Sequence, residues 1–181
     1  MNHIIGIIGT NSEQSTNRTL LTFMARHFAK DATIEVVEIK DIPMFNKPSN
    51  MEVPKEALAL AAKIEAADGV IISTPEYDHA VTASLMNALS WLSYGIYPFV
   101  DKPVMITGAS YGTLGSSRAQ AHLRQILNAP ELKARIMPSS EFLLGHSLQA
   151  FDEEGNLKDQ NQVAELEGLF SDFTTFMAIM K

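Results

Sequence analysis

The sequence contains no cysteine. This absence excludes disulfide bonds, thiolate metal ligands and cysteine nucleophiles, so any redox chemistry must depend on a bound cofactor. Runs of lysine and arginine are also missing, and the formal net charge is −7. Nucleic-acid binders gain most of their affinity from clustered basic residues that neutralise phosphates, so we expect no nucleic-acid partner.

Long apolar segments are absent as well. No window of the sequence approaches the roughly 20 apolar residues that a membrane-spanning helix needs, and the apolar start from Ile4 to Ile8 is too short for a signal-peptide core. We therefore expect no membrane association and a cytoplasmic location.

The five histidines show no metal-ligand spacing, so no metal site is predicted. A chain of 181 residues, 46% of them hydrophobic, predicts one domain over residues 1–181.

The sequence does contain an alternation of short apolar runs and amphipathic segments. Strands are predicted at residues 3–9, 33–39, 70–73, 104–107 and, as one long fifth strand, roughly 135–144. Helices are predicted from Ser15 or Thr16, from Pro54, and over roughly 82–92, 116–128 and 161–180. This order predicts an α/β, doubly wound, five-stranded parallel sheet with helices on both faces. Such sheets bind ligands beyond the carboxyl ends of their strands.

The segment after the first strand, GTNSEQSTN at residues 9–17, is rich in hydroxyl and amide side chains and directly precedes a helix. Helix N-termini present free N–H groups that bind anions. The Walker lysine is absent, and Gly6 and Gly9 do not form the dinucleotide fingerprint Gly-x-Gly-x-x-Gly. Glu38 is accordingly interpreted as a solvated strand end and not as a ribose-binding acid. With these two nucleotide-binding motifs excluded, the loop is best suited to a monophosphate held by neutral donors, such as that of FMN. The alternative is that Ser and Thr only cap the helix.

Two further loops, after the third and fourth strands, carry distinctive motifs. STPEYDHAVT at residues 73–82 precedes a helix with the pattern LMNALSW, and GASYGTLGSSRA at residues 108–119 precedes Leu123-Arg124. With the first loop, these motifs resemble the NADPH-dependent FMN reductase family, which includes quinone, chromate and azo-dye reductases. The patterns of that family are approximately Gly-Ser-x-Arg-x-x-Ser-x-Asn, then Pro-Glu-Tyr-Asn-His-Ser-x-Pro, then a glycine-rich loop. The resemblance implies a flavodoxin-like fold with strand order 2-1-3-4-5.

The resemblance also implies an FMN site built from the three loops, with the phosphate at the first loop and the ring against the other two. The residues that we expect to bind FMN are Thr10, Asn11, Ser12, Ser15, Thr16, Asn17, Pro75, Glu76, Tyr77, Asp78, Ser110, Tyr111, Gly112 and Gly115. The two glycines would let the backbone approach a flat ligand. Because the cofactor carries the chemistry, no catalytic residue is predicted.

The chain departs from the family pattern at two positions of this expected site. Ser12 stands where the family usually has arginine, which removes a charged partner for the phosphate. Asp78 stands where asparagine is common, and its carboxylate would be mildly unfavourable near a reduced flavin. Backbone contacts to the cofactor would survive both changes.

The activity that the resemblance implies is an NAD(P)H-dependent oxidoreductase. Hydride would pass from NADPH or NADH through bound FMN to a small-molecule acceptor, such as flavin, a quinone or an azo compound, by a ping-pong mechanism. The alternatives are a flavodoxin-type electron carrier and a flavin-free binding module. The carrier's usual loop, Thr-Gly-x-Thr-Gly-x-Thr, is not present here.

An aromatic cluster follows the third predicted helix and consists of Trp91, Tyr94, Tyr97 and Phe99. Aromatic residues of this kind either form subunit interfaces or close the edge of a core. Together with the family resemblance, the cluster predicts a homodimer or a dimer-based homotetramer.

Overall fold

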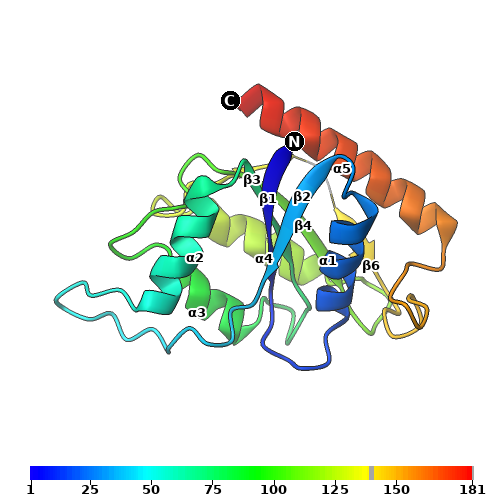
Figure 1. The fold of residues 1–181 in the computed structure, drawn as a ribbon. Coiled ribbons are helices and arrows are strands. Elements are labelled where there is room, and N and C mark those ends of the chain that lie inside the picture. The colour runs from blue at the N-terminus through cyan, green and yellow to red at the C-terminus, as the bar shows by residue number, and fades with distance from the viewer. Residues whose placement is uncertain (139–140, 181) are drawn as a thin grey trace.

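The computed structural model describes residues 1–138 and 141–180. Its strands are β1 (Asn2–Ile8), β2 (Ala32–Val37), β3 (Gly69–Ser73), β4 (Pro103–Ala109), β5 (Arg135–Ile136) and β6 (Phe142–Leu144). Its helices are α1 (Thr16–His27), α2 (Lys55–Ala66), α3 (Ala83–Trp91), α4 (Ser117–Leu127) and α5 (Gln160–Met180). The strands pair in parallel in the order β2-β1-β3-β4-β5, so the predicted flavodoxin-like topology is confirmed (Figure 1).

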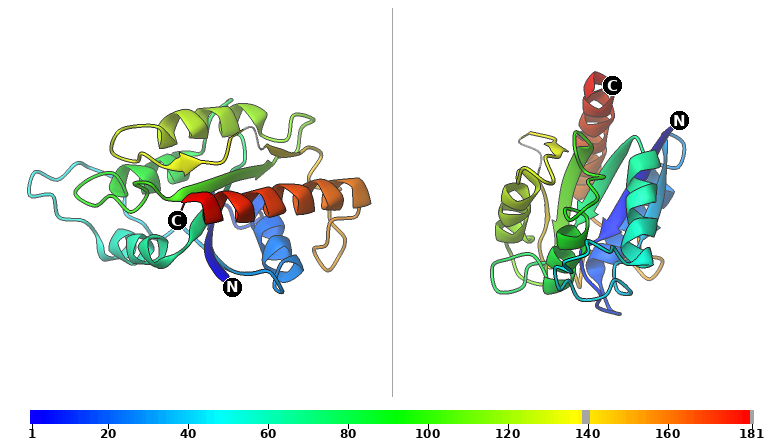
Figure 2. Two further views of the ribbon diagram at one scale, coloured as in Figure 1. Left: turned by 90° about the horizontal axis from the view of Figure 1, so that it is seen from above. Right: turned by 90° about the vertical axis from the view of Figure 1, so that its left-hand side faces the viewer.

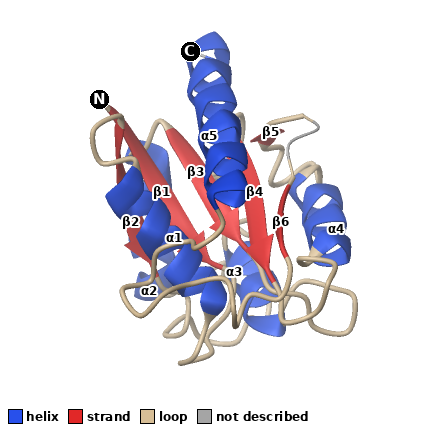
Figure 3. Cartoon of the chain, turned by 90° about the vertical axis from the view of Figure 1, so that its right-hand side faces the viewer, coloured by secondary structure: helices blue, strands red, loops and turns tan. Residues whose placement is uncertain are grey.

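Helices cover both faces of the sheet because the central strands are apolar on both sides. In β1, Ile4 and Ile8 pack with α1 and α5, whereas Ile5 and Ile7 pack with α2, α3 and α4. Successive residues of a strand point to opposite faces, so one continuous apolar run supplies two cores. Figure 3 shows α1 and α5 over one face of the sheet.

The predicted fifth strand, residues 135–144, is wrong as a single element. The structure has β5 paired with the start of β4 and β6 paired with its end, and residues 139–140 of the predicted strand lie outside the described residues. While β4 advances from Val104 to Thr107, its partner advances from Ile136 to Phe142, so the partner carries extra residues over the same span. Pro138 lies in this stretch, and proline cannot donate to a strand ladder.

The aromatic cluster after α3 mainly closes the core. Trp91 and Phe99 are buried, and the indole Nε1 of Trp91 donates to the carbonyl oxygen of Pro43 at 2.8 Å. The hydroxyl of Tyr94 donates to the carbonyl oxygen of Pro48, also at 2.8 Å. These contacts fasten the long loop between β2 and α2 onto α3. Only Tyr97 of the cluster, 49% exposed, presents a large surface to solvent.

Both chain ends lie at the amino edge of the sheet (Figures 1 and 2). β1 and β2 begin there side by side, with Asn2 opposite Ala32. The last turns of α5 pack where β3 begins, because Phe173 and Met177 fill the space beside Gly69. The loops that follow β1, β3 and β4 lie at the opposite, carboxyl edge of the sheet. In the part of the chain that the structure describes, no helix is long and apolar enough to cross a membrane.

Candidate functional site

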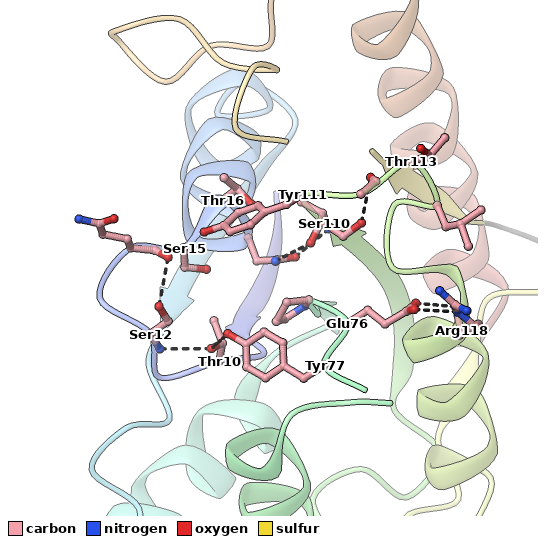
Figure 4. Close-up of a pocket in the computed structure, with 16 residues that line it drawn as sticks. Thr10, Ser12, Ser15, Thr16, Glu76, Tyr77, Ser110, Tyr111, Thr113 and Arg118 are labelled. Atoms are coloured by element: carbon pink, nitrogen blue, oxygen red, sulfur yellow. Dashed lines mark hydrogen bonds and ion pairs between the residues drawn. The ribbon is translucent and has the colours of Figure 1, made fainter. Parts of the chain in front are cut away.

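The loops after β1, β3 and β4 converge at the carboxyl edge and enclose a cavity of about 550 Å³ (Figure 4). This volume is typical of sites for small molecules and cofactors. The lining residues are Thr10, Ser12, Gln14, Ser15, Thr16, Asn17, Pro75, Glu76, Tyr77, Ala109, Ser110, Tyr111, Gly112, Thr113, Leu114 and Arg118. The structure thus brings most of the residues that the sequence analysis selected to one place.

Three of the selected residues lie outside this lining: Asn11, Asp78 and Gly115. Five lining residues were not selected, namely Gln14, Ala109, Thr113, Leu114 and Arg118. All five fall inside the first and third motifs, so the motifs located them. Ala109 and Leu114 carry no local signal for a ligand, whereas Gln14, Thr113 and Arg118 have polar side chains that could have been selected.

The first loop and the start of α1 form the polar end of the cavity. Ser15 caps the helix, and its hydroxyl accepts the N–H of Arg18 at 3.2 Å. The hydroxyl of Thr10 accepts the N–H of Ser12 at 3.2 Å and lies 3.3 Å from the hydroxyl of Tyr77. Since the other first-turn N–H groups of a helix have no intrahelical acceptor, this end can bind an anion.

Asn17 lies beneath this end, and its side chain ties the sheet together. Its carbonyl oxygen Oδ1 accepts the N–H of Ala109 and the hydroxyl of Ser73, both at 2.9 Å. Its Nδ2 donates to the carbonyl oxygen of Ala109 at 3.0 Å. Only 2% of the residue is exposed. The amide of Asn17 therefore joins α1 to the ends of β3 and β4, which leaves its backbone N–H as the group suited to an anion.

The second loop turns tightly at Asp78 and His79. Tyr77 and Ala80 exchange two backbone hydrogen bonds, of 3.0 and 3.1 Å, and the two residues between them have φ angles of 50° and 65°. Positive φ at both central positions is the geometry of a type I′ turn, which favours Asn, Asp and Gly at its start. Asp78 is thus explained by the turn that it forms, and it is exposed outside the cavity lining.

Glu76 uses its carboxylate to cap α4. Oε2 accepts the N–H groups of Arg118 at 3.0 Å and of Ala119 at 3.3 Å, and Oε1 accepts the Nε of Arg118 at 2.7 Å. Ser116, at the N-cap position of α4, makes no side-chain capping bond. The charged groups of the cavity lining, Glu76 and Arg118, are therefore paired with each other (Figure 4). This pair fixes the second loop to the third.

Replacing Glu76 with alanine is expected to lower the free energy of unfolding by about 1–3 kcal/mol, because two N–H groups at the start of α4 lose their acceptor. Arg118→Ala is the matched control, since it removes one guanidinium bond and leaves both backbone bonds in place. Urea unfolding followed by circular dichroism measures both variants. Equal losses in the two variants would show that the capping bonds contribute nothing.

The third loop contains two glycines with different surroundings. Gly112 lines the cavity, and no heavy atom lies within 4 Å of the position where a Cβ would stand. Gly115 has a φ of +56°, and a Cβ there would lie 2.4 Å from the carbonyl carbon of Leu143. Gly115 therefore makes room for the backbone of β6. Ser110 directly follows β4. Its hydroxyl accepts the N–H of Ser116 at 3.2 Å, and this bond orders the loop.

In the described part of the chain, no group of three or more His, Asp or Glu residues could hold a metal ion. His122 accepts the N–H of Val81 through its Nδ1 at 3.3 Å, which is a structural contact.

Comparisons with known proteins agree with this architecture. The family model for NADPH-dependent FMN reductase matches residues 2–149. The NADH:(hydroxy)cinnamate reductase subunit CrdA of Vibrio ruber is 57% identical over 97% of this chain and 87% of that protein. The NADH-dependent flavin reductase subunit 2 of Lactobacillus johnsonii is 39% identical over 96% of each chain, and the quinone reductase of Escherichia coli is 39% identical over 79% of this chain and 77% of that protein.

A similar solved structure is that of FerB, a flavoenzyme NAD(P)H:(acceptor) oxidoreductase from Paracoccus denitrificans. It superposes with a TM-score of 0.89, covers 99% of each chain and is 23% identical in sequence. At this level of identity the likeness shows a shared fold.

Proposed function

Because the chain belongs to the NADPH-dependent FMN reductase family of oxidoreductases, we propose that its cavity binds FMN and that the enzyme uses NADH or NADPH to reduce a small-molecule acceptor. The observation that carries this proposal is the layout of the cavity. One end offers a helix N-terminus and neutral donors, and the other end is walled by backbone and aromatic groups.

The polar end fits the phosphate of FMN. The hydroxyls of Thr10, Ser12, Ser15 and Thr16 line it, together with the start of α1. No acidic side chain lines this end, and the partial positive charge of the helix N-terminus favours a dianion. The residues present thus match the charge and the hydrogen-bonding capacity of a phosphate group.

The opposite end fits a flat ring. Pro75 and Tyr77 form one side and Tyr111 and Gly112 the other, and the open space at Gly112 lets a planar ligand approach the backbone. Tyr77 is 48% exposed and Tyr111 is 58% exposed, so both rings lie at the mouth of the cavity. A second substrate can approach the ring through this mouth, past the two tyrosines.

Access through this mouth is compatible with a ping-pong order, in which the nicotinamide nucleotide and the acceptor occupy the same place in turn. Bound FMN would supply the hydride-transfer chemistry, and the protein would hold the ring and its phosphate. We propose flavins, quinones and azo compounds as acceptors. Relatives named for NADH suggest that NADH is used as well as NADPH.

Two relatives are named as subunits of reductases, which favours a second candidate for the acceptor: a redox group on a partner protein. The exposed Tyr77, Tyr111 and Leu114 surround the mouth and offer an apolar surface for such a partner or for a second copy of this chain. A homodimer or dimer-based homotetramer in the cytoplasm remains our prediction for the assembly.

The proposal predicts that purified protein binds FMN and then oxidises NADH or NADPH when a quinone is added. Flavin absorbance of the desalted protein measures binding, and loss of reduced nicotinamide absorbance measures turnover. The same preparation without FMN is the control. Bound FMN without turnover would identify an electron carrier or a subunit that needs its partner, and protein that retains no FMN would identify a flavin-free binding module.

A further inference from the structure

Arg18 lies in the first turn of α1, on the outer side of the loop that forms the polar end of the cavity. Its Nη1 donates to the carbonyl oxygens of Ser12 at 2.9 Å and of Glu13 at 3.0 Å. Its Nε and Nη2 donate to the two carboxylate oxygens of Glu38, at the end of β2. Glu38 is exposed at the end of β2, as expected of a solvated strand end, and its carboxylate also holds the guanidinium of Arg18 in place.

The two carbonyl groups that Arg18 binds belong to consecutive peptide units. In a trans peptide the C=O and N–H bonds point in opposite directions, so the N–H groups of Glu13 and Gln14 point away from Arg18. Arg18 is not part of the cavity lining, whereas Ser12 and Gln14 are, so away from Arg18 means toward the cavity. Within the described residues, neither N–H donates to another group. Successive N–H groups oriented in this way form an anion-binding concavity.

This arrangement bears directly on position 12, where the family usually has arginine and this chain has serine. Arg18 brings a guanidinium to the same loop from the outer side. Its hydrogen bond lowers the pKa of Glu38, and Glu38 raises the pKa of Arg18, so the pair is charged at neutral and mildly acidic pH. Because the pair carries no net charge, its effect on a phosphate comes mainly through the geometry of the loop.

We propose that Arg18, held by Glu38, is a positioning residue that aims the N–H groups of Glu13 and Gln14 at the FMN phosphate. The inference rests on the proposed function, since it needs FMN in the cavity. It predicts that loss of Arg18 affects the part of flavin affinity that depends on the phosphate and leaves the part that depends on the ring unchanged.

The test compares FMN with riboflavin, which has the same ring and no phosphate. Dissociation constants are measured by quenching of flavin fluorescence for the wild type, Arg18→Met, Arg18→Lys and Glu38→Gln. We expect Arg18→Met to weaken FMN binding about 10- to 30-fold, because several charge-assisted bonds that order the loop are lost. The affinity for riboflavin should change less than about twofold. Arg18→Lys and Glu38→Gln should weaken FMN binding by smaller factors, because the first keeps a positive charge at position 18 and the second keeps the guanidinium of Arg18.

Arg26→Met is the matched control. Arg26 is on the same helix, but its Nη2 donates to Gly155 and Asn156 at the other end, so its loss should change neither affinity. Equal weakening of FMN and riboflavin in the Arg18 variants would overturn the inference, and so would unchanged FMN affinity. A wild-type protein that binds neither flavin would instead overturn the proposed function itself. If Arg18→Met does not fold, Arg18→Lys and Glu38→Gln decide the question through the same FMN-to-riboflavin ratio.

Discussion

Replacement of Asn17 by alanine is expected to lower the free energy of unfolding by about 3–5 kcal/mol. The side chain satisfies three buried groups at once: the N–H and the carbonyl oxygen of Ala109 and the hydroxyl of Ser73. Each buried polar group that loses its partner costs about 1–3 kcal/mol. The lost contacts also join the start of α1 to β3 and β4, so we expect FMN affinity to fall along with stability.

Ser15→Ala is the control for Asn17→Ala, because it lies two residues earlier in the same helix start. Loss of the Ser15 cap should cost about 1 kcal/mol, the usual effect of removing an N-cap hydroxyl. Urea unfolding of the FMN-free proteins measures both losses. An Asn17→Ala variant no less stable than Ser15→Ala would mean that water replaces the amide at little cost and that the strand ends need no such tie.

The second large effect is expected at Gly115. Gly115→Ala should lower the free energy of unfolding by about 2–4 kcal/mol, for two reasons. Its φ of +56° is unfavourable for any residue with a Cβ, which costs about 1–2 kcal/mol. The added carbon would also stand 2.4 Å from the backbone of Leu143, so β6 would have to shift.

Gly112→Ala offers a control only three positions away. Open space surrounds its missing Cβ, so we expect the free energy of unfolding to change by less than about 0.5 kcal/mol. Because Gly112 lines the cavity, its substitution should weaken FMN binding without loosening the fold. Thermal unfolding without flavin and FMN titration separate the two outcomes. Similar stability losses at both positions would contradict the assignment of Gly115 to the packing of β6.

Sequence patterns predicted the layers and the order of the sheet well, since apolar runs such as Ile4 to Ile8 reflect burial on two faces. They also located the cavity, because the three motifs stand at the ends of adjacent parallel strands. The break between β5 and β6 was missed although the sequence signals it: Pro138 and the polar residues after it interrupt the apolar run of residues 135–144, and β4 pairs separately with the two parts.

The roles of charged and amide side chains were harder to predict. Glu76 was expected to bind FMN and Glu38 to be a solvated strand end, and neither expectation included the arginine with which each pairs, Arg118 and Arg18 respectively. Asn17 was selected as a phosphate ligand from its position in the motif, and its amide is instead committed to the strands. These hydrogen bonds and ion pairs depend on which residues the fold brings close together. The type of an amino acid shows only which bonds its side chain can form.

The connection between α1 and β2 lies at the amino edge of the sheet, opposite the cavity, which has a practical consequence for bioelectronics. Since the chain has no thiol of its own, a cysteine introduced at the exposed Lys30, between α1 and β2, would be unique. Attachment of this thiol to a gold electrode would orient every molecule with its cavity toward the solution. Soluble nicotinamide nucleotides and acceptors would then reach the mouth freely, and the sheet would separate the cavity from the metal surface.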